Sequence, residues 1–520
     1  MKSPYFTEEH VLFRDTARQF MQTEVIPFAN EWEKEKQIPR SIWEKMGELG
    51  FLGINFPEKY GGADADFFYT VAFLEEVGHC ALAGFTAAVL VQQYMATAHL
   101  YKVGSEALKE KYLVPSIAGK LVGALAVTEP DAGSDVAAIR MRAVRDGDEY
   151  VLNGSKTFIT NGVYGDFITV AVKTNPEAGV EGISLIIVDS EAPGFSAKKL
   201  EKMGLHCSDT GELAFDDVRV PASNLIGQEN MGFYYIMESF QLERLVAAIT
   251  SVGTSETCIE DTLKYITERE VFNRPLAKFQ VIRHALADAA TELEAARQLT
   301  YYTAWLYEQG EQAIREFSMV KLLTTELSKK IADICLQFFG GYGYMDEYPI
   351  SRIYRDARVS TIVGGASEIM RDIIAKVMID QVKYDSAYAQ AEQKPLEGSE
   401  ALPEKSERAA VHPPETVAEL FQTLPKRFRP EKAGDWETVV HFDISGDAGG
   451  QYTVMIKDGA CTVEPGLQGE AKCVVKTKDK TYLNIEMGKT NPQTAFMMGK
   501  IKVSNLAEMM QFGKVFRRIS

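Results

Sequence analysis

Hydrophobic and polar positions follow different periods in successive parts of the chain. From residue 1 to about 121, apolar residues recur every three or four positions, as in VLFRDTARQFM, which is typical of helices with one buried face. Between residues 122 and 232 the pattern changes to short runs rich in β-branched residues, such as YVLNGSKTFIT and ISLIIVD, which predict strands. Helical periodicity returns over residues 233–384. We therefore expect a helical domain, a β-domain and a second helical domain, in this order.

The residues after 384 form two further segments. Residues 385–412 are rich in Pro, Glu and Ser and contain almost no large apolar residue, which is typical of a linker. Residues 413–520 combine a short helix, strand patterns such as TVVHFDI and QYTVMIK, and more helix. A segment of about 100 residues is large enough to fold alone. The sequence thus predicts a multidomain protein that ends in a small α+β domain.

The charge distribution supports a boundary near residue 413 and disfavours one class of partner. The formal net charge of the chain is −17, and nucleic acid is an unfavourable partner because phosphate binding requires a basic face. From residue 413 onward, 15 Lys and Arg stand against 13 Asp and Glu. The acidic excess therefore belongs to the preceding domains.

Targeting signals and cysteine usage indicate a reducing compartment. No run approaches the ~20 apolar residues of a membrane helix, so we expect no integral membrane segment. The start lacks the apolar stretch of a secretory signal, and the C-terminal RRIS is not an SKL-type signal. We expect a cytoplasmic protein, with a cleaved transit peptide as the alternative. The six cysteines occur singly, which predicts reduced, mostly buried thiols and no metal site.

Four motifs occur in order ahead of the linker. They are ALAVTEPDAGSD (124–135), NGSKTFITNG (153–162), EREVFNRPLAKFQ (268–280) and QFFGGYGYMDEYPISRIYRDAR (337–358). Together they resemble the acyl-CoA dehydrogenase family, from about residue 7 to 384. The resemblance implies an α-helical N-terminal domain, a central β-domain and a C-terminal four-helix bundle. It also implies FAD as cofactor and the α,β-dehydrogenation of a fatty acyl-CoA to the trans-2-enoyl-CoA, with electrons passed to an electron-transfer flavoprotein.

The resemblance assigns a set of residues to the flavin. Small residues in TEPDAGSD let backbone N–H groups approach the ring and stabilise negative charge there, although this segment alone fits an ordinary hairpin loop equally well. Phe158 stands where many relatives carry a tryptophan against the flavin. In the family, Arg269 and Gln280 would bind the adenosine end across a dimer contact, which implies a homotetramer. Glu368 would contact the flavin or cap a helix N-terminus. The expected cofactor residues are Leu125, Val127, Thr128, Gly133, Ser134, Phe158, Ile159, Thr160, Arg269, Gln280, Gln337, Gly340, Gly341, Ala366 and Glu368.

The catalytic base must be found among the carboxylates. The reaction needs one carboxylate within hydrogen-bond reach of the α proton and donors to the thioester oxygen. Many relatives place this Glu directly after the RDAR-like segment, where this chain has Gly364. Isovaleryl- and long-chain-type relatives place it before an Arg on an earlier helix, as Glu243 precedes Arg244 here. The residues expected at the substrate are Glu243, Arg244, Ser134, Val363 and Gly364, whose backbone N–H can bind the thioester oxygen.

The helical neighbours of Glu243 favour a base. Positions three and four residues away are Ser239, Phe240, Val246 and Ala247, and none is a cation. We expect a poorly solvated carboxylate with a raised pKa. The alternative is a solvent-facing Glu on an amphipathic helix.

The C-terminal domain carries a second resemblance. MGKTNPQTAFMMGKIKVSNLAEMMQF (487–512) is similar to the sterol-carrier-protein-2 family, over about residues 416–516. The resemblance implies a small sheet covered by helices and a lipid or fatty acyl chain as ligand. The methionines at 497, 498, 509 and 510 suit a lipid tunnel and core packing equally well.

Two other functions remain open from the sequence. A flavin oxidase of the same fold would hand the electrons to oxygen. A non-catalytic acyl-CoA or lipid carrier would lack a working base, so Glu243 is the residue that separates it from an enzyme.

Overall fold

The computed structural model describes residues 4–382, 416–433, 436–457, 459–487, 495, 499–505, 508, 509, 511, 512, 515 and 516. The expected linker 385–412 and the methionines at 497, 498 and 510 lie outside the described residues. Contacts divide the chain into a larger unit, Arg14–Leu52 with Ala65–Pro395, and a smaller unit, Met1–Phe13 with Gly53–Asp64 and Leu396–Ser520.

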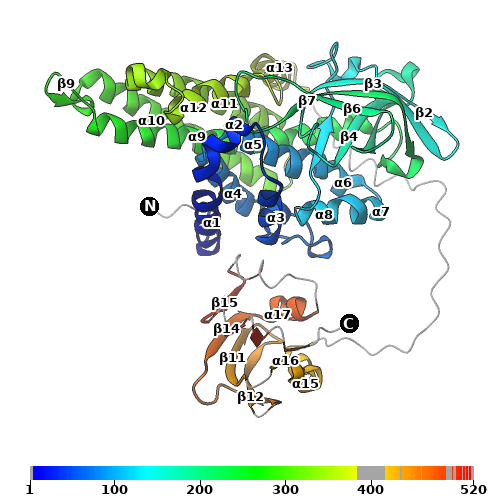
Figure 1. The fold of residues 1–520 in the computed structure, drawn as a ribbon, viewed down its shortest axis with the longest axis vertical. Coiled ribbons are helices and arrows are strands. Elements are labelled where there is room, and N and C mark those ends of the chain that lie inside the picture. The colour runs from blue at the N-terminus through cyan, green and yellow to red at the C-terminus, as the bar shows by residue number, and fades with distance from the viewer. Residues whose placement is uncertain are drawn as a thin grey trace. The chain divides into compact units, whose positions relative to one another are not determined.

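Short helices precede the sheet (Figure 1). They are α1 (Glu8–Phe20), α2 (Ala29–Glu35), α3 (Arg40–Glu48), α4 (Phe67–His79), α5 (Ala83–Leu90), α6 (Thr97–Val103), α7 (Glu106–Leu108) and α8 (Val114–Ile117). The Asp66 carboxylate caps α4 by accepting a bond from the Phe68 N–H at 2.9 Å. Every residue of α4 from Phe67 to Gly78 is buried. A helix that is buried all round lies inside its domain, and α4 packs along α9.

An eight-stranded sheet forms the middle of the larger unit. Its strands are β1 (Gly123–Ala126), β2 (Arg142–Asp146), β3 (Glu149–Thr160), β4 (Phe167–Lys173), β5 (Ile183–Asp189), β6 (Phe195–Lys199), β7 (Thr210–Pro221) and β8 (Leu225–Ile226). The order is β6-β7-β3-β2-β4-β5-β8, and β1 pairs with β4 in parallel. β4 is buried along its whole length, whereas β7 alternates between buried and exposed positions. β7 therefore lies with one face on the core and one in solvent.

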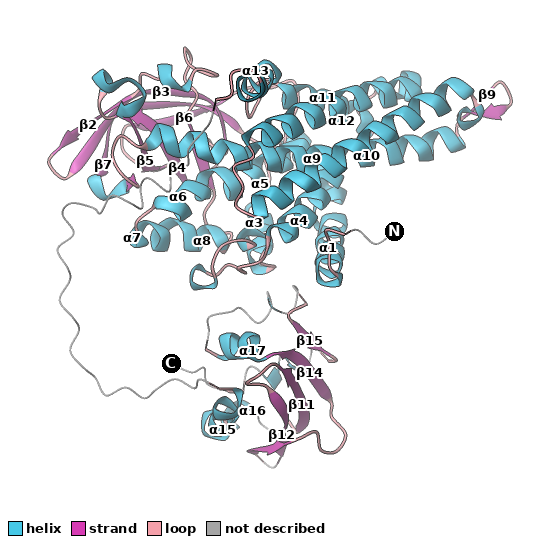
Figure 2. Cartoon of the chain, turned by 180° about the vertical axis from the view of Figure 1, so that it is seen from behind, coloured by secondary structure: helices cyan, strands magenta, loops and turns pink. Residues whose placement is uncertain are grey.

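Three long helices and two shorter ones among the described residues follow the sheet (Figure 2). They are α9 (Gly232–Glu268), α10 (Gln280–Glu308), α11 (Ile314–Phe339), α12 (Pro349–Ala357) and α13 (Ser367–Met378). The hairpin of β9 (Glu270–Val271) and β10 (Arg274–Pro275) joins α9 to α10 at the end remote from the sheet. α9 packs against both α4 and α11, so a side chain in the first half of α9 is enclosed by helices. The expected order of helices, sheet and helices is confirmed, while the domain boundaries themselves stay predictions.

The C-terminal domain of the smaller unit is a five-stranded sheet with helices. It contains α15 (Val417–Arg427), α16 (Pro430–Ala433), β11 (Thr438–Ser445), β12 (Gly450–Lys457), β13 (Ala460–Pro465), β14 (Cys473–Lys478), α17 (Asp479–Glu486) and β15 (Ile501–Val503). The strand order is β13-β12-β11-β14-β15. Phe421 of α15 stacks on Tyr452 with ring centroids 4.2 Å apart, and it also contacts Phe442 and Tyr482. Met509 packs against this aromatic core, so the expected α+β fold has a core of its own.

Two general expectations concern cysteines and membranes. All six cysteines are buried and unbridged, as the sequence predicts. Among the described residues, no helix combines the length and apolar content that crossing a bilayer requires.

Candidate active site

Glu243 lies in the first half of α9 and is buried, with 5% of its surface exposed. Among the residues that the structure describes, its Oε1 atom has no hydrogen-bond partner. Burial raises the pKa of the Glu243 carboxyl to about 8, although the Arg244 charge and a hydrogen bond from Ser239 act in the opposite direction. The solvent-facing alternative is therefore wrong. A buried polar atom without a partner is costly, and this cost is consistent with a carboxyl that meets a ligand.

Arg244 follows Glu243 and is also buried, with its guanidinium carbon 6.0 Å from the ring centroid of Phe240. Its positive charge contributes to a lowered pKa of Lys321, a buried residue of α11. Glu368 of α13 acts on the same lysine in the opposite direction. These couplings place residues of α9, α11 and α13 in one electrostatic neighbourhood.

The turn that carries Gly364 joins the 3-10 helix Arg358–Thr361 to α13. Gly364 and Gly365 have φ values of +62° and +94°, a region that favours glycine. A Cβ atom added at Gly364 would meet nothing within 4 Å, and Val363 is more than half exposed. The backbone of the turn is thus accessible to a ligand, as a donor to a thioester oxygen must be.

The TEPDAGSD segment is a tight hairpin turn fixed from beneath. Glu129 and Ala132 exchange two backbone hydrogen bonds of 2.9 and 3.1 Å, so the hairpin description is correct locally. The buried Lys156 ammonium donates to the Val127 carbonyl at 3.0 Å and to Glu129 Oε1 at 2.8 Å. Glu129 also accepts the backbone N–H groups of residues 140 and 141. Gly133 is exposed and has open space around it, so the ligand-facing side of a rigid turn is free for close approach.

Phe158 has an unusual backbone conformation next to this turn. Its φ is +61°, its side chain is 69% exposed, and the pairing of β3 with β7 shifts register between Lys156 and Ile159. A bulky residue at positive φ is an outlier, and bulges of this kind re-aim side chains next to active sites. The exposed ring fits a planar group such as a flavin. Ile159 is buried, so its side chain packs in the core and only its backbone is available to a cofactor.

The remaining residues near the expected flavin ring differ in exposure. Half-buried positions are Leu125, Val127, Thr128 and Thr160, whereas Ser134 is exposed. Ala366 occupies the N-cap position of α13, and this helix has no side-chain cap bond in the described structure. Glu368 is exposed in the first turn of α13, a position that fits both contact with a cofactor and a favourable interaction with the helix N-terminus.

A second group of expected residues surrounds a pocket of about 670 Å³ at the far end of the helical bundle. Arg269, Gln337, Gly340 and Gly341 line it together, and the Arg269 guanidinium lies 5.5 Å from the Tyr342 ring centroid. Gln280 is not part of this lining; it begins α10, with its amide 3.4 Å from the ring nitrogen of His284. Val281 gives the lining an exposed hydrophobic rim, and Phe272 and Tyr344, the chain neighbours of the lining residues Val271 and Met345, are strongly exposed as well. Such a rim suits a protein contact.

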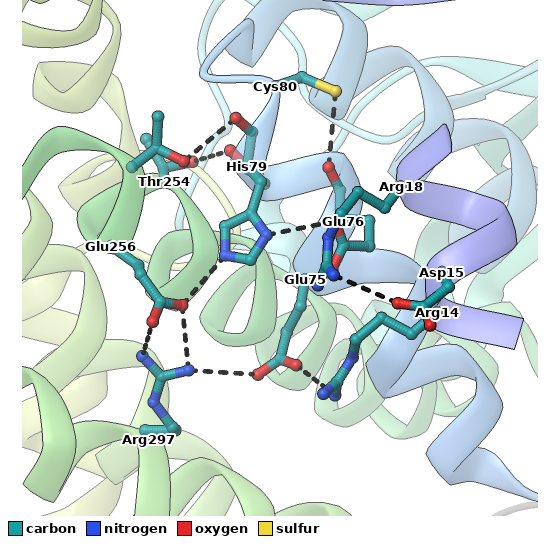
Figure 3. A network of polar contacts seen from close by, with 12 residues as sticks. Arg14, Asp15, Arg18, Glu75, Glu76, His79, Cys80, Thr254, Glu256 and Arg297 are labelled. Carbon is teal, nitrogen blue, oxygen red and sulfur yellow. Dashed lines mark hydrogen bonds and ion pairs between the residues drawn. The ribbon is translucent and has the colours of Figure 1, made fainter. Parts of the chain in front are cut away.

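A network of buried and half-buried charges joins α1, α4, α9 and α10 (Figure 3). His79 of α4 lies 3.0 Å from a Glu256 oxygen of α9, and Arg297 of α10 lies 3.0 Å from the same carboxylate. Arg14 of α1 pairs with Glu75 of α4 at 2.7 Å. In the part of the chain that the structure describes, no group of His, Cys, Asp and Glu is arranged to hold a metal ion. The ion pairs of this network join helices α4, α9 and α10.

Sequence reasoning missed three buried charged residues at the site. Lys156 and Glu129 occur inside the quoted motifs. The only sign of their burial in the sequence was the presence of a lysine, Lys156, within a predicted strand. Lys321 lies in FSMVKLLTT, where a charge interrupts the apolar face of a helix. Such a residue is buried only if it has a partner, and the partner becomes visible only in the fold.

Comparisons with known proteins agree with this geometry. The family models of the acyl-CoA dehydrogenase N-terminal, middle and C-terminal domains match residues 7–120, 124–218 and 230–379. The SCP-2 sterol transfer family matches residues 419–517.

Individual relatives cover the dehydrogenase part. The mitochondrial long-chain specific acyl-CoA dehydrogenase of Rattus norvegicus is 41% identical over 72% of this chain and 87% of its own length. The crystal structure of an acyl-CoA dehydrogenase from Geobacillus kaustophilus is 44% identical, with a TM-score of 0.70 over 73% of this chain and all of that one. A chain of a structure titled as the electron transferring flavoprotein of Acidaminococcus fermentans is 37% identical over 73% of this chain and all of that one, with a TM-score of 0.71. The protein belongs to the acyl-CoA dehydrogenase family and carries a C-terminal domain of the SCP-2 sterol transfer family.

Proposed function

We propose that the protein dehydrogenates long-chain fatty acyl-CoA thioesters, with Glu243 as the base that removes the α proton. The observation that carries this proposal is the buried Glu243 carboxyl, whose Oε1 has no partner in the described structure and whose pKa is raised to about 8. A base with such a pKa is well matched to proton abstraction near neutral pH. The relative named for long-chain substrates supports the substrate class.

FAD, the cofactor of this family, supplies the acceptor for the hydride from the β carbon. The residues of this chain would do the rest. The backbone N–H of Gly364 binds the thioester oxygen and stabilises the negative charge that develops as the α proton leaves. Arg244 orients the Glu243 carboxylate and favours its charged form. The Lys156–Glu129 pair keeps the hairpin turn rigid, and Phe158 covers the cofactor ring and excludes water.

The pocket at Arg269 would receive the adenosine half of the cofactor. An arginine, a glutamine amide and two glycines suit a pyrophosphate, and the exposed hydrophobic rim favours a second subunit there. A homotetramer built as a dimer of dimers satisfies such contacts through closed symmetry. Sedimentation of a monomer that still retains FAD tightly would contradict this assembly.

An electron-transfer flavoprotein is the proposed acceptor, because a related chain belongs to a structure titled for such a protein. The rival is a flavin oxidase. Under air, an oxidase releases peroxide in proportion to substrate, whereas a dehydrogenase reduces an added dye faster than it reduces oxygen. The C-terminal domain is proposed to bind lipid or fatty acyl chains and to deliver them to the active site.

The experiment for this function is an anaerobic titration of the purified flavoprotein with acyl-CoA thioesters of increasing length. We expect long straight chains, such as palmitoyl-CoA, to bleach the flavin fastest. Fastest bleaching by butyryl-CoA would contradict the substrate class, and no bleaching by any acyl-CoA would contradict the activity.

A further inference from the structure

Lys321 is a buried lysine that contacts the Gly364–Gly365 turn of the candidate active site. It lies on α11 with 1% of its surface exposed, and its Nζ donates to the Gly365 carbonyl at 2.5 Å. We propose that Lys321 is a positioning residue that holds the Gly364–Gly365 turn so that its backbone N–H faces the substrate thioester oxygen. This inference rests on the proposed function.

The turn needs such a support because its own residues provide little. Backbone bonds fix both flanks, from the Val363 N–H to the Val359 carbonyl at 3.1 Å and from the Met370 N–H to the Ala366 carbonyl at 3.0 Å. Between these flanks are two consecutive glycines at positive φ. Glycine has the greatest backbone freedom of all residues. The bond from Lys321 to the Gly365 carbonyl restricts this freedom at the centre of the turn.

The absence of a glutamate at this turn makes the support more important. A glutamate at the position of Gly364 would leave the backbone less freedom than glycine does. In this chain the base is Glu243 on α9, and the turn is left with the task of binding the thioester oxygen through its backbone. An N–H donor stabilises developing charge only if it is oriented before the reaction.

At this buried position, a charged hydrogen-bond donor costs more free energy than a neutral donor. Burial lowers the pKa of Lys321 to about 8, and the nearby Arg244 charge acts in the same direction. The carboxylates of Glu326 and Glu368 oppose this shift. A neutral donor would satisfy the Gly365 carbonyl without the cost of burying an ammonium group. A positive charge behind the turn adds favourable potential where negative charge develops on the thioester oxygen.

The test compares FAD-loaded Lys321→Met with the unaltered enzyme, both bound to a trans-2-enoyl-CoA labelled with ¹³C at the thioester carbonyl. This product analogue cannot reduce the flavin, so the readout is independent of turnover. Hydrogen bonds to a carbonyl oxygen lower its infrared stretching frequency. We expect the bound carbonyl of the unaltered enzyme to shift to lower frequency and Lys321→Met to lose at least half of this shift. Lys321→Arg, which keeps a cationic donor, should retain most of it.

Kinetics provide a second readout with a matched control. We expect Lys321→Met to lower kcat roughly 10- to 100-fold, short of the ~10²–10³-fold loss of a whole oxyanion donor, with a much smaller change in KM. The control is Lys202→Met, which removes a half-buried lysine that also donates to a backbone carbonyl, that of Ser208 at 2.9 Å, away from the turn. If Lys321 had a purely structural role, Lys321→Met would behave like the control Lys202→Met. Its melting temperature would fall and the carbonyl shift of the bound ligand would stay unchanged.

The outcomes separate this inference from the proposed function. A carbonyl shift equal to that of the unaltered enzyme in Lys321→Met would overturn the role of Lys321 alone. No shift in the unaltered enzyme would overturn the thioester-binding turn itself, whereas a flavin that no acyl-CoA bleaches would overturn the proposed function. If Lys321→Met fails to fold, Lys321→Ala takes its place, because it also lacks a donor for the Gly365 carbonyl. A wild-type shift in that variant would overturn the inference in the same way.

Discussion

At the scale of single residues, the proposed chemistry depends on a buried carboxyl whose ionisation costs free energy. Glu243 is buried and its pKa is raised to about 8, so the free protein holds it protonated at neutral pH. Folding therefore becomes less favourable as pH rises from the ordinary Glu pKa of 4.5 toward 8, because only the unfolded chain loses this proton freely. Such a cost is typical of functional positions.

The first prediction is a pH dependence of flavin reduction by substrate. A base acts only when it is deprotonated, so the rate should rise with pH, pass its midpoint near the pKa of about 8, and level off above it. Stopped-flow reduction of the enzyme-bound flavin at constant ionic strength measures this directly. A rate that is flat between pH 6 and pH 9 would show that no group with this pKa limits proton removal.

Part of the candidate site could be predicted from the sequence, and the rest could not, for a physical reason. The raised pKa of Glu243 could be predicted because no cation lies among its neighbours three and four residues away, while its role as the base, which rests on the Glu-Arg pair and the two glycines, stays a prediction. The support given by Lys321 to Gly365 joins residues 44 positions apart, and no local pattern encodes this pairing. The positive φ of Phe158 likewise comes from the register shift of β3 against β7, which is a property of two strands together.

At the scale of elements, α9 is positioned by ion pairs with helices on two sides. His79 of α4 lies between Glu76 and Glu256, which raise the pKa of the imidazole to about 9 against the opposing effect of burial. Hydrogen bonding to His79 lowers the pKa of Glu256 to about 2. These shifts mean that the charged forms of both groups stabilise the fold.

The second prediction concerns this pair. Stabilisation by His79 is complete below its ordinary pKa of 6.5 and is lost as pH rises through 9. His79→Gln should therefore lower the free energy of unfolding by about 1.5–3 kcal/mol at pH 6, the size of a hydrogen bond to a charged group, and by less at pH 10. Thermal unfolding at the two pH values tests this. His284→Gln, at an exposed position of α10, is the control, and an equal loss at both pH values would contradict the account.

At the scale of the whole molecule, the chain joins two units that each have a hydrophobic core. The core of the C-terminal domain is built from Phe421, Phe442 and Tyr482, and that of the bundle from residues such as Leu286 and Ile331. Two modules of one chain experience each other at up to about millimolar effective concentration. The proposed role of the C-terminal domain in this arrangement is to supply poorly soluble substrates to the dehydrogenase.

The third prediction follows from this delivery role. A chain truncated after residue 390 should oxidise short acyl-CoA at the normal rate and show a several-fold lower kcat/KM for long-chain acyl-CoA. The C-terminal domain added separately at micromolar concentration should not restore the loss, because it cannot reach the effective concentration of the tethered domain. Equal kinetics of the full and truncated chains on long substrates would rule out delivery.

The most direct measurement of the central claim is single-turnover flavin reduction in Glu243→Gln, which preserves shape and removes the proton acceptor. FAD content should be unchanged, and the variant should be at least as stable as the unaltered enzyme at pH 8, since it no longer buries an ionisable carboxyl. Reduction by long-chain acyl-CoA should fall by at least the ~10²–10⁴-fold typical of a lost general base. Glu260→Gln, at an exposed position of the same helix, should leave the rate unchanged. Reduction of Glu243→Gln at nearly the wild-type rate would show that another group removes the α proton.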